Sequence, residues 1–196
     1  QLVYGTDEII RVQTEFYKKL FKTEGSNLEQ RQFFGNFLKN PIGPENFAIL
    51  NKKIDLDDIF SALKKIKKNS SPGPDGITYE FYLEFFDVLK DDLLQVYTTS
   101  YAEKELAYSQ YLALIILLYK KDVREDIKNW RPISLSNTDI KILSKIMAER
   151  LKKVLPYIIH VNQCGFVKGR KIGQGIRFVE DTLERMEEEN IILNDY

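Results

Sequence analysis

Apolar residues recur at helical spacing along most of the chain, which predicts a mostly helical protein. The first predicted helix covers residues 6–22 with Thr6 as its N-cap, and a weaker one covers residues 26–39. A third helix begins after Asp55, a good N-cap residue, and places apolar side chains on one face as far as Ile66. The N-terminal third is therefore predicted to consist of helices joined by short breaks.

A rigid turn is predicted at residues 70–76, because two prolines there fix φ and two glycines allow conformations closed to other residues. Aromatic side chains follow at helical spacing and predict a helix with a densely packed face, with another helix near residues 91–105. The aromatic residues expected in the core are Phe81, Tyr82, Phe85 and Phe86.

The pattern changes at residues 112–119, where apolar residues are continuous. A run that is short and unbroken predicts a strand buried on both faces. A charged loop at 120–129 separates this run from a second predicted strand at 131–136. The two strands together predict an antiparallel ribbon whose loop projects basic side chains.

A long helix is predicted after the ribbon, capped by Asn137 or Thr138 and stopped by Pro156. A loop rich in Gly, Lys and Arg follows at residues 165–175, and then a helix near residues 174–189. The apolar face of the long helix is expected to consist of Ile140, Leu143, Met147, Leu151 and Val154. These elements together define a mostly helical α+β protein.

Composition excludes several classes of site. One cysteine, Cys164, cannot form an internal disulfide or a Cys-rich zinc site, and one histidine, His160, leaves little for a His-based metal centre or a Ser-His-Asp triad. A reducing compartment is the expected location. No apolar run reaches the roughly 18 residues of a membrane span, and no signal peptide is recognisable, so no membrane partner is expected.

The zero net charge of the chain hides a strong asymmetry. Residues 120–177 contain fourteen Lys and Arg against five Asp and Glu, a net charge of +9, so the rest of the chain carries −9. A basic middle with acidic flanks predicts an anion-binding surface.

Four motifs occur in a specific order along the chain. They are Ser-Pro-Gly-Pro-Asp-Gly-Ile at 71–77, Asn-Trp-Arg-Pro-Ile-Ser-Leu at 129–135, Lys-Ile-Leu-Ser-Lys-Ile-Met-Ala-Glu-Arg-Leu at 141–151 and Gln-Cys-Gly-Phe-Val-Lys-Gly-Arg at 163–170. In this order they closely resemble the N-terminal reverse-transcriptase region of non-LTR (LINE-type) retrotransposons, over residues 50–196.

The resemblance implies the fingers of a right-hand polymerase, with a short antiparallel ribbon and the first palm strand. It divides the chain into a helical lead-in at residues 1–50, an N-terminal extension at 51–110, the fingers at 111–189 and the start of the palm strand at 190–196. It implies template RNA, a DNA primer and incoming dNTP as partners, together with the remaining palm and thumb. The expected location is intracellular, in the cytoplasm and nucleus.

Roles for individual residues follow from the same resemblance. Arg131 corresponds to an arginine that contacts the triphosphate of the incoming nucleotide, and Lys120 and Lys121 resemble fingertip lysines that have a similar role. Pro72 and Asp75 belong to the extension that lies near template RNA. The loop expected near the template and the nucleotide contains Gln163, Gly165, Phe166, Lys168, Arg170 and Lys171.

The last residues resemble the start of the palm strand, which places Asp195 at the catalytic, metal-binding aspartate position. Polymerisation uses two Mg²⁺ ions about 3.5–4 Å apart, held by several carboxylates. One aspartate cannot hold that pair, so the chain alone is expected to be an inactive part of a polymerase. Two alternatives remain open, which are a non-catalytic RNA-binding module similar to the fingers and part of a group II intron maturase.

Overall fold

The computed structural model describes residues 3–23, 25, 27–35 and 42–188, with only the backbone of Phe34. This part of the chain is mostly helical with one two-stranded sheet, which confirms the α+β prediction. Its elements are α1 (Thr6–Leu20), α2 (Leu28–Gly35), α3 (Pro44–Asn51), α4 (Leu56–Lys64), α5 (Tyr79–Glu84), α6 (Phe86–Glu103), α7 (Tyr108–Tyr111), β1 (Ala113–Tyr119), a 3₁₀ turn (Ile127–Asn129), β2 (Trp130–Ser136), α8 (Thr138–Ile158) and α9 (Ile172–Glu188).

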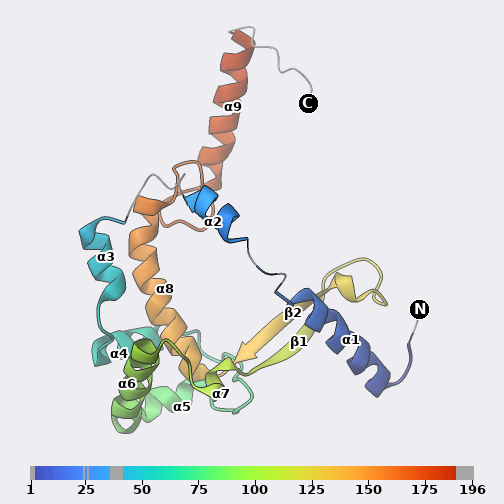
Figure 1. Cartoon of the computed structure of the whole chain (residues 1–196), viewed down its shortest axis with the longest axis vertical. Helices are drawn as coiled ribbons and strands as arrows, with labels where there is room; N and C mark the ends of the chain where they lie inside the picture. Colours follow the sequence, from blue (N-terminus) through green and yellow to red (C-terminus); the bar gives the residue numbers. More distant parts are fainter. Residues whose placement is uncertain (1–2, 24, 26, 36–41, 189–196) are drawn as a thin grey trace.

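Helix α8 is the central element of the arrangement (Figure 1). The ribbon of β1 and β2 leaves from the N-terminal end of α8, and the loop leading to α9 lies at its opposite end. Helices α3 and α4 pack directly against α8, and α6 packs against α4. The main core lies between these helices and consists of Ile54, Ile59, Ala62, Leu63, Tyr79, Leu93, Tyr97, Ile142 and Ile146.

The sequence signals at helix ends were reliable where a side chain makes the cap. Asp55 accepts a hydrogen bond from the backbone N–H of Asp58 at 2.8 Å and begins α4 as predicted. The prediction for α1 was wrong by one residue, because Gly5 occupies the N-cap position and Thr6 is the first helical residue. Helix α3 was not predicted, although Pro44 at its first position is a typical start signal.

The aromatic segment forms two helices, α5 and α6, which meet at Phe85. Tyr82 and Phe86 pack against the core, whereas Phe81 and Phe85 are exposed, so the prediction that all four are core was wrong for these two. The rings of Phe81 and Phe85 lie 4.8 Å apart between centroids and cover part of each other's surface. The chain bends between α5 and α6, and the helical spacing of the aromatics therefore does not continue on one face.

Helix α8 buries a face that overlaps the predicted one only in part, with Val154 buried as predicted. Its buried side chains are Ile142, Ile146, Arg150 and Val154, together with Thr138 at its start. Leu143 and Met147 pack at the edge of the core, and Leu151 is 44% exposed. Pro156 lies inside the last turn and does not end the helix, which continues to Ile158.

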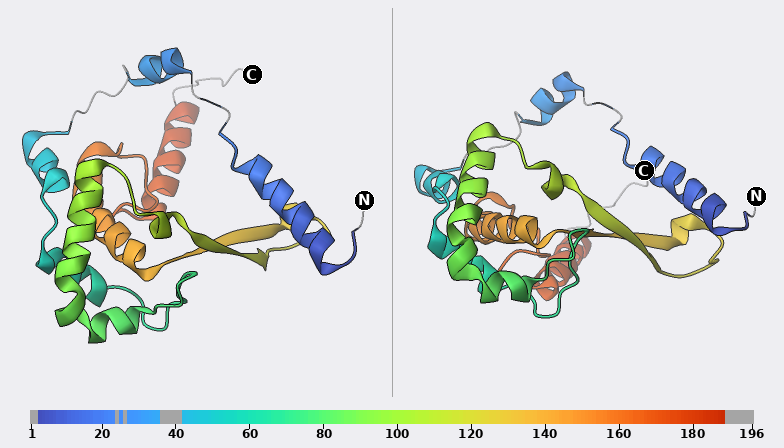
Figure 2. Two further views of the ribbon diagram at one scale, coloured as in Figure 1. Left: turned by 60° about the horizontal axis from the view of Figure 1, so that its bottom comes forward. Right: turned by 90° about the horizontal axis from the view of Figure 1, so that it is seen from below.

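The ribbon confirms the two predicted strands but not their burial. β1 and β2 are antiparallel, with Ala113 opposite Ser136 and Tyr119 opposite Trp130. Leu114 and Leu118 are 55% and 52% exposed, so the expectation of a strand buried on both faces was wrong. Within the described residues β1 has a single partner strand, and α1 lies beside the loop end of the ribbon (Figure 2). The predicted start of the palm strand at 190–196 lies outside the described residues.

No helix in the described part of the chain is long and apolar enough to cross a membrane.

Candidate nucleic-acid interface

The loop end of the ribbon carries the three residues predicted to bind nucleotide. Arg131 stands opposite Leu118 in the ladder, and the backbone N–H of Lys120 donates to the carbonyl of Asn129 at 2.9 Å. Lys120, Lys121 and Arg131 are all exposed. The structure thus brings two lysines that follow β1 and an arginine of β2 to one end of the ribbon.

Local hydrogen bonds fold the loop between the strands back on itself. The indole N–H of Trp130 donates to the carbonyl of Arg124 at 2.8 Å, and the Asn129 amide donates to the carbonyl of Val123 at 2.9 Å. The guanidinium of Arg124 lies 4.8 Å from the centroid of the Tyr119 ring, so this arginine is engaged in a cation–π contact. Lys120 and Arg131 form no ion pair with another described residue, which leaves their charges available to an anionic ligand.

The proline-glycine turn docks at the base of the same ribbon. Gly73 lies so close to the start of α8 that a Cβ placed there would be 2.4 Å from the backbone N of Asn137. The hydroxyl of Thr138 donates to the carbonyl of Ile77 at 2.7 Å, and the Lys141 ammonium donates to the carbonyl of Ser71 at 2.7 Å. The turn is therefore fastened to the β2–α8 junction, and sequence reasoning did not foresee this contact.

The two turn residues predicted to lie near template RNA differ in exposure. Pro72 is half-buried and Asp75 is exposed. The Asp75 carboxylate accepts from the backbone N–H of Ile77 at 2.9 Å, and its own N–H donates to the Asn137 side chain at 3.3 Å. Asp75 thus holds the shape of the turn and its place beside the ribbon.

A largely buried polar network also holds the junction between β2 and α8. The phenol of Tyr97 donates to the carbonyl of Asp139 at 2.7 Å, and the amide of Gln110 donates to the Asp139 carboxylate at 2.9 Å. Burial raises the pKa of the neighbouring Tyr82 to about 12, with smaller contributions from the charges of Asp139 and Asp75. These residues carry no sequence signal, because they come from separate helices and meet only in the fold.

The second predicted template loop lies at the opposite end of α8. A helix of 21 residues is about 30 Å long, so this loop and the ribbon are not brought together. Gln163, Lys168 and Lys171 are exposed and Gly165 is half-buried. Phe166 is fully exposed and has a φ of 62°.

Arg170 has a structural contact that the sequence did not indicate. Its guanidinium donates to the carbonyls of Ile159 and Gln163, each at 2.9 Å, and also to those of Pro156 at 3.3 Å and His160 at 2.5 Å. These carbonyls lie at and beyond the C-terminus of α8, where a cation is favoured by the helix dipole. Arg170 therefore closes this end of the helix, and its role in template binding stays a prediction.

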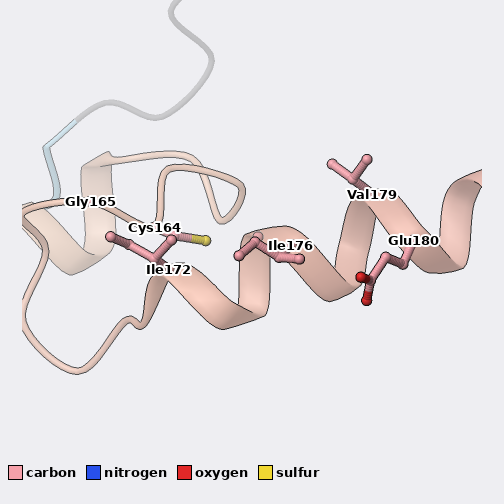
Figure 3. Close-up of a pocket in the computed structure, with 7 residues that line it drawn as sticks. Cys164, Gly165, Ile172, Ile176, Val179 and Glu180 are labelled. Carbon is pink, nitrogen blue, oxygen red and sulfur yellow. The ribbon is translucent and has the colours of Figure 1, made fainter.

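An open pocket lies between this loop and α9 (Figure 3). Its lining is largely apolar and includes Cys164, Ile172, Ile176 and Val179. Glu180 is the charged residue of the lining. The pocket offers no cation to a phosphate group, so we do not assign it to nucleic acid.

No metal centre is formed by the part of the chain that the structure describes, where no three His, Cys, Asp or Glu side chains come together. Asp195, the predicted metal ligand, lies outside the described residues. The described residues therefore do not fit a pair of divalent cations.

Comparison with known proteins adds sequence relatives to this geometry. Residues 118–194 match the family described as "Reverse transcriptase (RNA-dependent DNA polymerase)". The chain is 36% identical over 188 residues to the "Transposon TX1 uncharacterized 149 kDa protein" of Xenopus laevis, an alignment that covers 84% of the chain. It is 25% identical over 142 residues, 71% of the chain, to the "Retrovirus-related Pol polyprotein from type-1 retrotransposable element R1" of Bradysia coprophila. In each case it spans 14% of the relative's length.

Proposed function

The chain belongs to the reverse transcriptases of non-LTR (LINE-type) retrotransposons, and we propose that it forms the fingers and the beginning of the palm in such an RNA-directed DNA polymerase. The polymerase activity is proposed for the longer protein, since the chain spans 14% of the relatives it matches. That protein would copy template RNA onto a DNA primer from dNTPs. It would act inside the cell, in the cytoplasm and nucleus.

The observation that carries this proposal is the exposed cationic end of the ribbon within the matched region. Arginine offers a planar fork that pairs with two phosphate oxygens, and lysine offers a compact charge. Arg131 is held in β2 by the ladder, whereas Lys120 and Lys121 follow the end of β1. We assign Arg131 to the triphosphate of the incoming nucleotide, with the two lysines beside it.

We assign template RNA to the two segments at the ends of α8. The turn with Pro72 and Asp75 lies at the base of the ribbon, and the loop of residues 163–171 lies about 30 Å away. The exposed ring of Phe166 suits stacking on a base, and Lys168 and Lys171 suit phosphate contacts. The residues assigned to this loop contact are Gln163, Gly165, Phe166, Lys168, Arg170 and Lys171.

The family acts with divalent metal ions, and we propose Mg²⁺ for this polymerase, with Asp195 as one ligand in the complete enzyme. Because two such ions require several carboxylates, the chain of 196 residues is expected to be inactive by itself. Its own contribution to the reaction is to bind and orient the nucleotide and the template.

The test is Arg131→Ala in the full-length polymerase, measured by primer extension on an RNA template. Loss of a charge-assisted contact of about 1.5–3 kcal/mol should lower kcat/KM for dNTP roughly tenfold or more, mainly by raising KM. Arg124→Ala is the matched control, because Arg124 lies in the loop next to Arg131 but packs on Tyr119. The same assay on the isolated chain should give no extension.

An unchanged kcat/KM in a folded Arg131→Ala protein, or equal losses in both variants, would refute the assignment. Template-dependent extension by the isolated chain that vanishes in Asp195→Ala would refute its proposed inactivity.

A further inference from the structure

Two segments that are distant in sequence form one lysine-rich surface along α8. One segment is the end of α4 with the chain that follows it, and the other is a single stripe of α8. Ion pairs join them, since the Glu149 carboxylate lies 3.0 Å from Lys65, 3.6 Å from Lys145 and 3.9 Å from Lys152. We call this surface the lysine face, and it consists of Lys65, Lys67, Lys68, Lys141, Lys145 and Lys152.

The two segments run side by side over the whole face. At one end Lys65 contacts Glu149, and at the other Lys141 donates to the carbonyl of Ser71. Lys67 and Lys68 lie between these two fastening points in the chain and are exposed. The segment 65–71 is thus fastened beside α8 at both of its ends.

Positive charge on this strip is not balanced within it. The carboxylates that face the lysines are Glu149, whose pKa is lowered chiefly by its hydrogen bond from Lys65, and Glu80. Glu80 accepts from the backbone N–H of Asn69 at 2.8 Å and faces Lys68. Six lysines against two glutamates leave a net charge of about +4 on the face.

Local helix chemistry does not explain this charge. Lysines at the end of α4 complement the negative C-terminal end of that helix. Lys141, however, is the fourth residue of α8, at the positive end of its dipole, where a cation is disfavoured. At Lys141 the stripe on α8 therefore carries a cation that the dipole of its own helix does not stabilise.

The length of the strip suits a nucleic-acid strand. Lys141 and Lys152 are eleven residues apart on α8, which corresponds to about 16 Å along the helix. A strand of a duplex carries one phosphate per about 3.4 Å of axis, so roughly five phosphates span that distance. The strip also runs along the helix that separates the turn at 71–77 from the loop at 163–171.

We propose that the lysine face binds the phosphate backbone of RNA and guides it along α8 between the two ends of that helix. This inference rests on the proposed function, and it adds a contact surface that joins two lysines of the motif at 141–151 to Lys65, Lys67, Lys68 and Lys152, which lie outside the four motifs. Lysines make point-charge contacts with phosphates and do not read bases, so binding at this face is independent of sequence.

The experiment measures binding of a 30-nucleotide single-stranded RNA to the chain over a range of salt concentrations. The test variant is the triple substitution Lys68→Gln, Lys145→Gln and Lys152→Gln. The control variant, Lys19→Gln, Lys90→Gln and Lys104→Gln, removes the same charge from α1 and the region of α6. Circular dichroism establishes that both variants are folded.

Each phosphate contact contributes about 0.7 to the slope of log K against log salt for a single strand. The test variant should therefore lose about 2 from the slope, and its Kd at 0.1 M salt should rise tenfold or more. The control variant should keep the slope of the parent. Equal slopes for test and control would overturn the proposal.

A third variant, Lys168→Gln with Lys171→Gln, removes charge from the loop assigned to template RNA and separates this inference from the proposed function. If this loop variant weakens binding and the lysine-face variant does not, the lysine face is refuted while the template assignment stands. If the parent chain binds no RNA, the lysine face and the template assignment are both refuted.

Discussion

Replacement of Gly73 by alanine tests how firmly the turn is fastened to the ribbon. A Cβ at this position would lie 2.4 Å from the backbone N of Asn137 and 2.5 Å from the carbonyl carbon of Ser136. Ordinary contacts begin at 3.4 Å, so the turn or the start of α8 must move by about 1 Å. Two of the three clashing atoms belong to the backbone, and the third is the side-chain oxygen of Asn137, so a rotamer change alone cannot relieve the contact.

The cost follows from the contacts that such a shift disrupts. Three hydrogen bonds join the turn to α8, from Thr138 to Ile77, from Lys141 to Ser71 and from Asp75 to Asn137. Each contributes about 0.5–1.5 kcal/mol, and overpacking alone costs about 1–3 kcal/mol. We expect Gly73→Ala to lower the free energy of unfolding by about 2–4 kcal/mol.

Urea denaturation followed by circular dichroism measures this loss. The control is Gly173→Ala, because nothing lies within 4 Å of its added Cβ and alanine favours the helix α9 in which it lies. The control should match or slightly exceed the parent in stability. A Gly73→Ala protein within about 0.5 kcal/mol of the parent would show that the turn is not docked at Asn137.

Two further substitutions test other contacts of the fold. Arg170→Ala should lower the free energy of unfolding by about 1–3 kcal/mol and speed hydrogen exchange at the end of α8, because four carbonyls lose a charged donor. The control Lys168→Ala should have neither effect. Equal unfolding free energies and equal exchange rates in these two variants would contradict the conclusion that Arg170 closes the end of α8. The pKa of Asp55 is lowered chiefly by the hydrogen bond from Lys52 and further by the hydrogen bond from the backbone N–H of Asp58. The Asp55 carboxylate therefore stabilises the fold above its ordinary pKa of 3.8, and this stabilisation is lost as the pH falls through the lower pKa of the folded state. Asp55→Asn should therefore flatten the acid side of the stability profile below about pH 5, and an unaltered profile would contradict this reasoning.

Much of the fold could be predicted because its determinants are local. The helical spacing of apolar residues, the Asp55 cap and the change of pattern near residue 112 depend only on neighbours along the chain. The cationic ribbon end was also predictable, because a hairpin of two adjacent strands necessarily brings Lys120 and Arg131 to the same end.

Burial could not be predicted in the same way. The spacing on α8 allows several faces to be apolar, and the positions of α3 and α4 select the one that includes Arg150. That arginine, 6% exposed, donates to the carbonyl of Lys53 at 3.2 Å and to Asp58 at 2.9 Å. A charged residue on a buried face is satisfied only by partners from another segment, which periodicity does not reveal.

The sequence by itself determined the types and order of most elements, α3 excepted, together with the family motifs and the basic middle of the chain. The tertiary structure decided that the apolar run of β1 stays exposed, that the two predicted template segments lie at opposite ends of α8, and that Lys65 meets Glu149. The physical reason is the range of the interactions. Helix and strand formation depends on residues within a few positions, whereas burial and charge clusters depend on which distant surfaces are packed together.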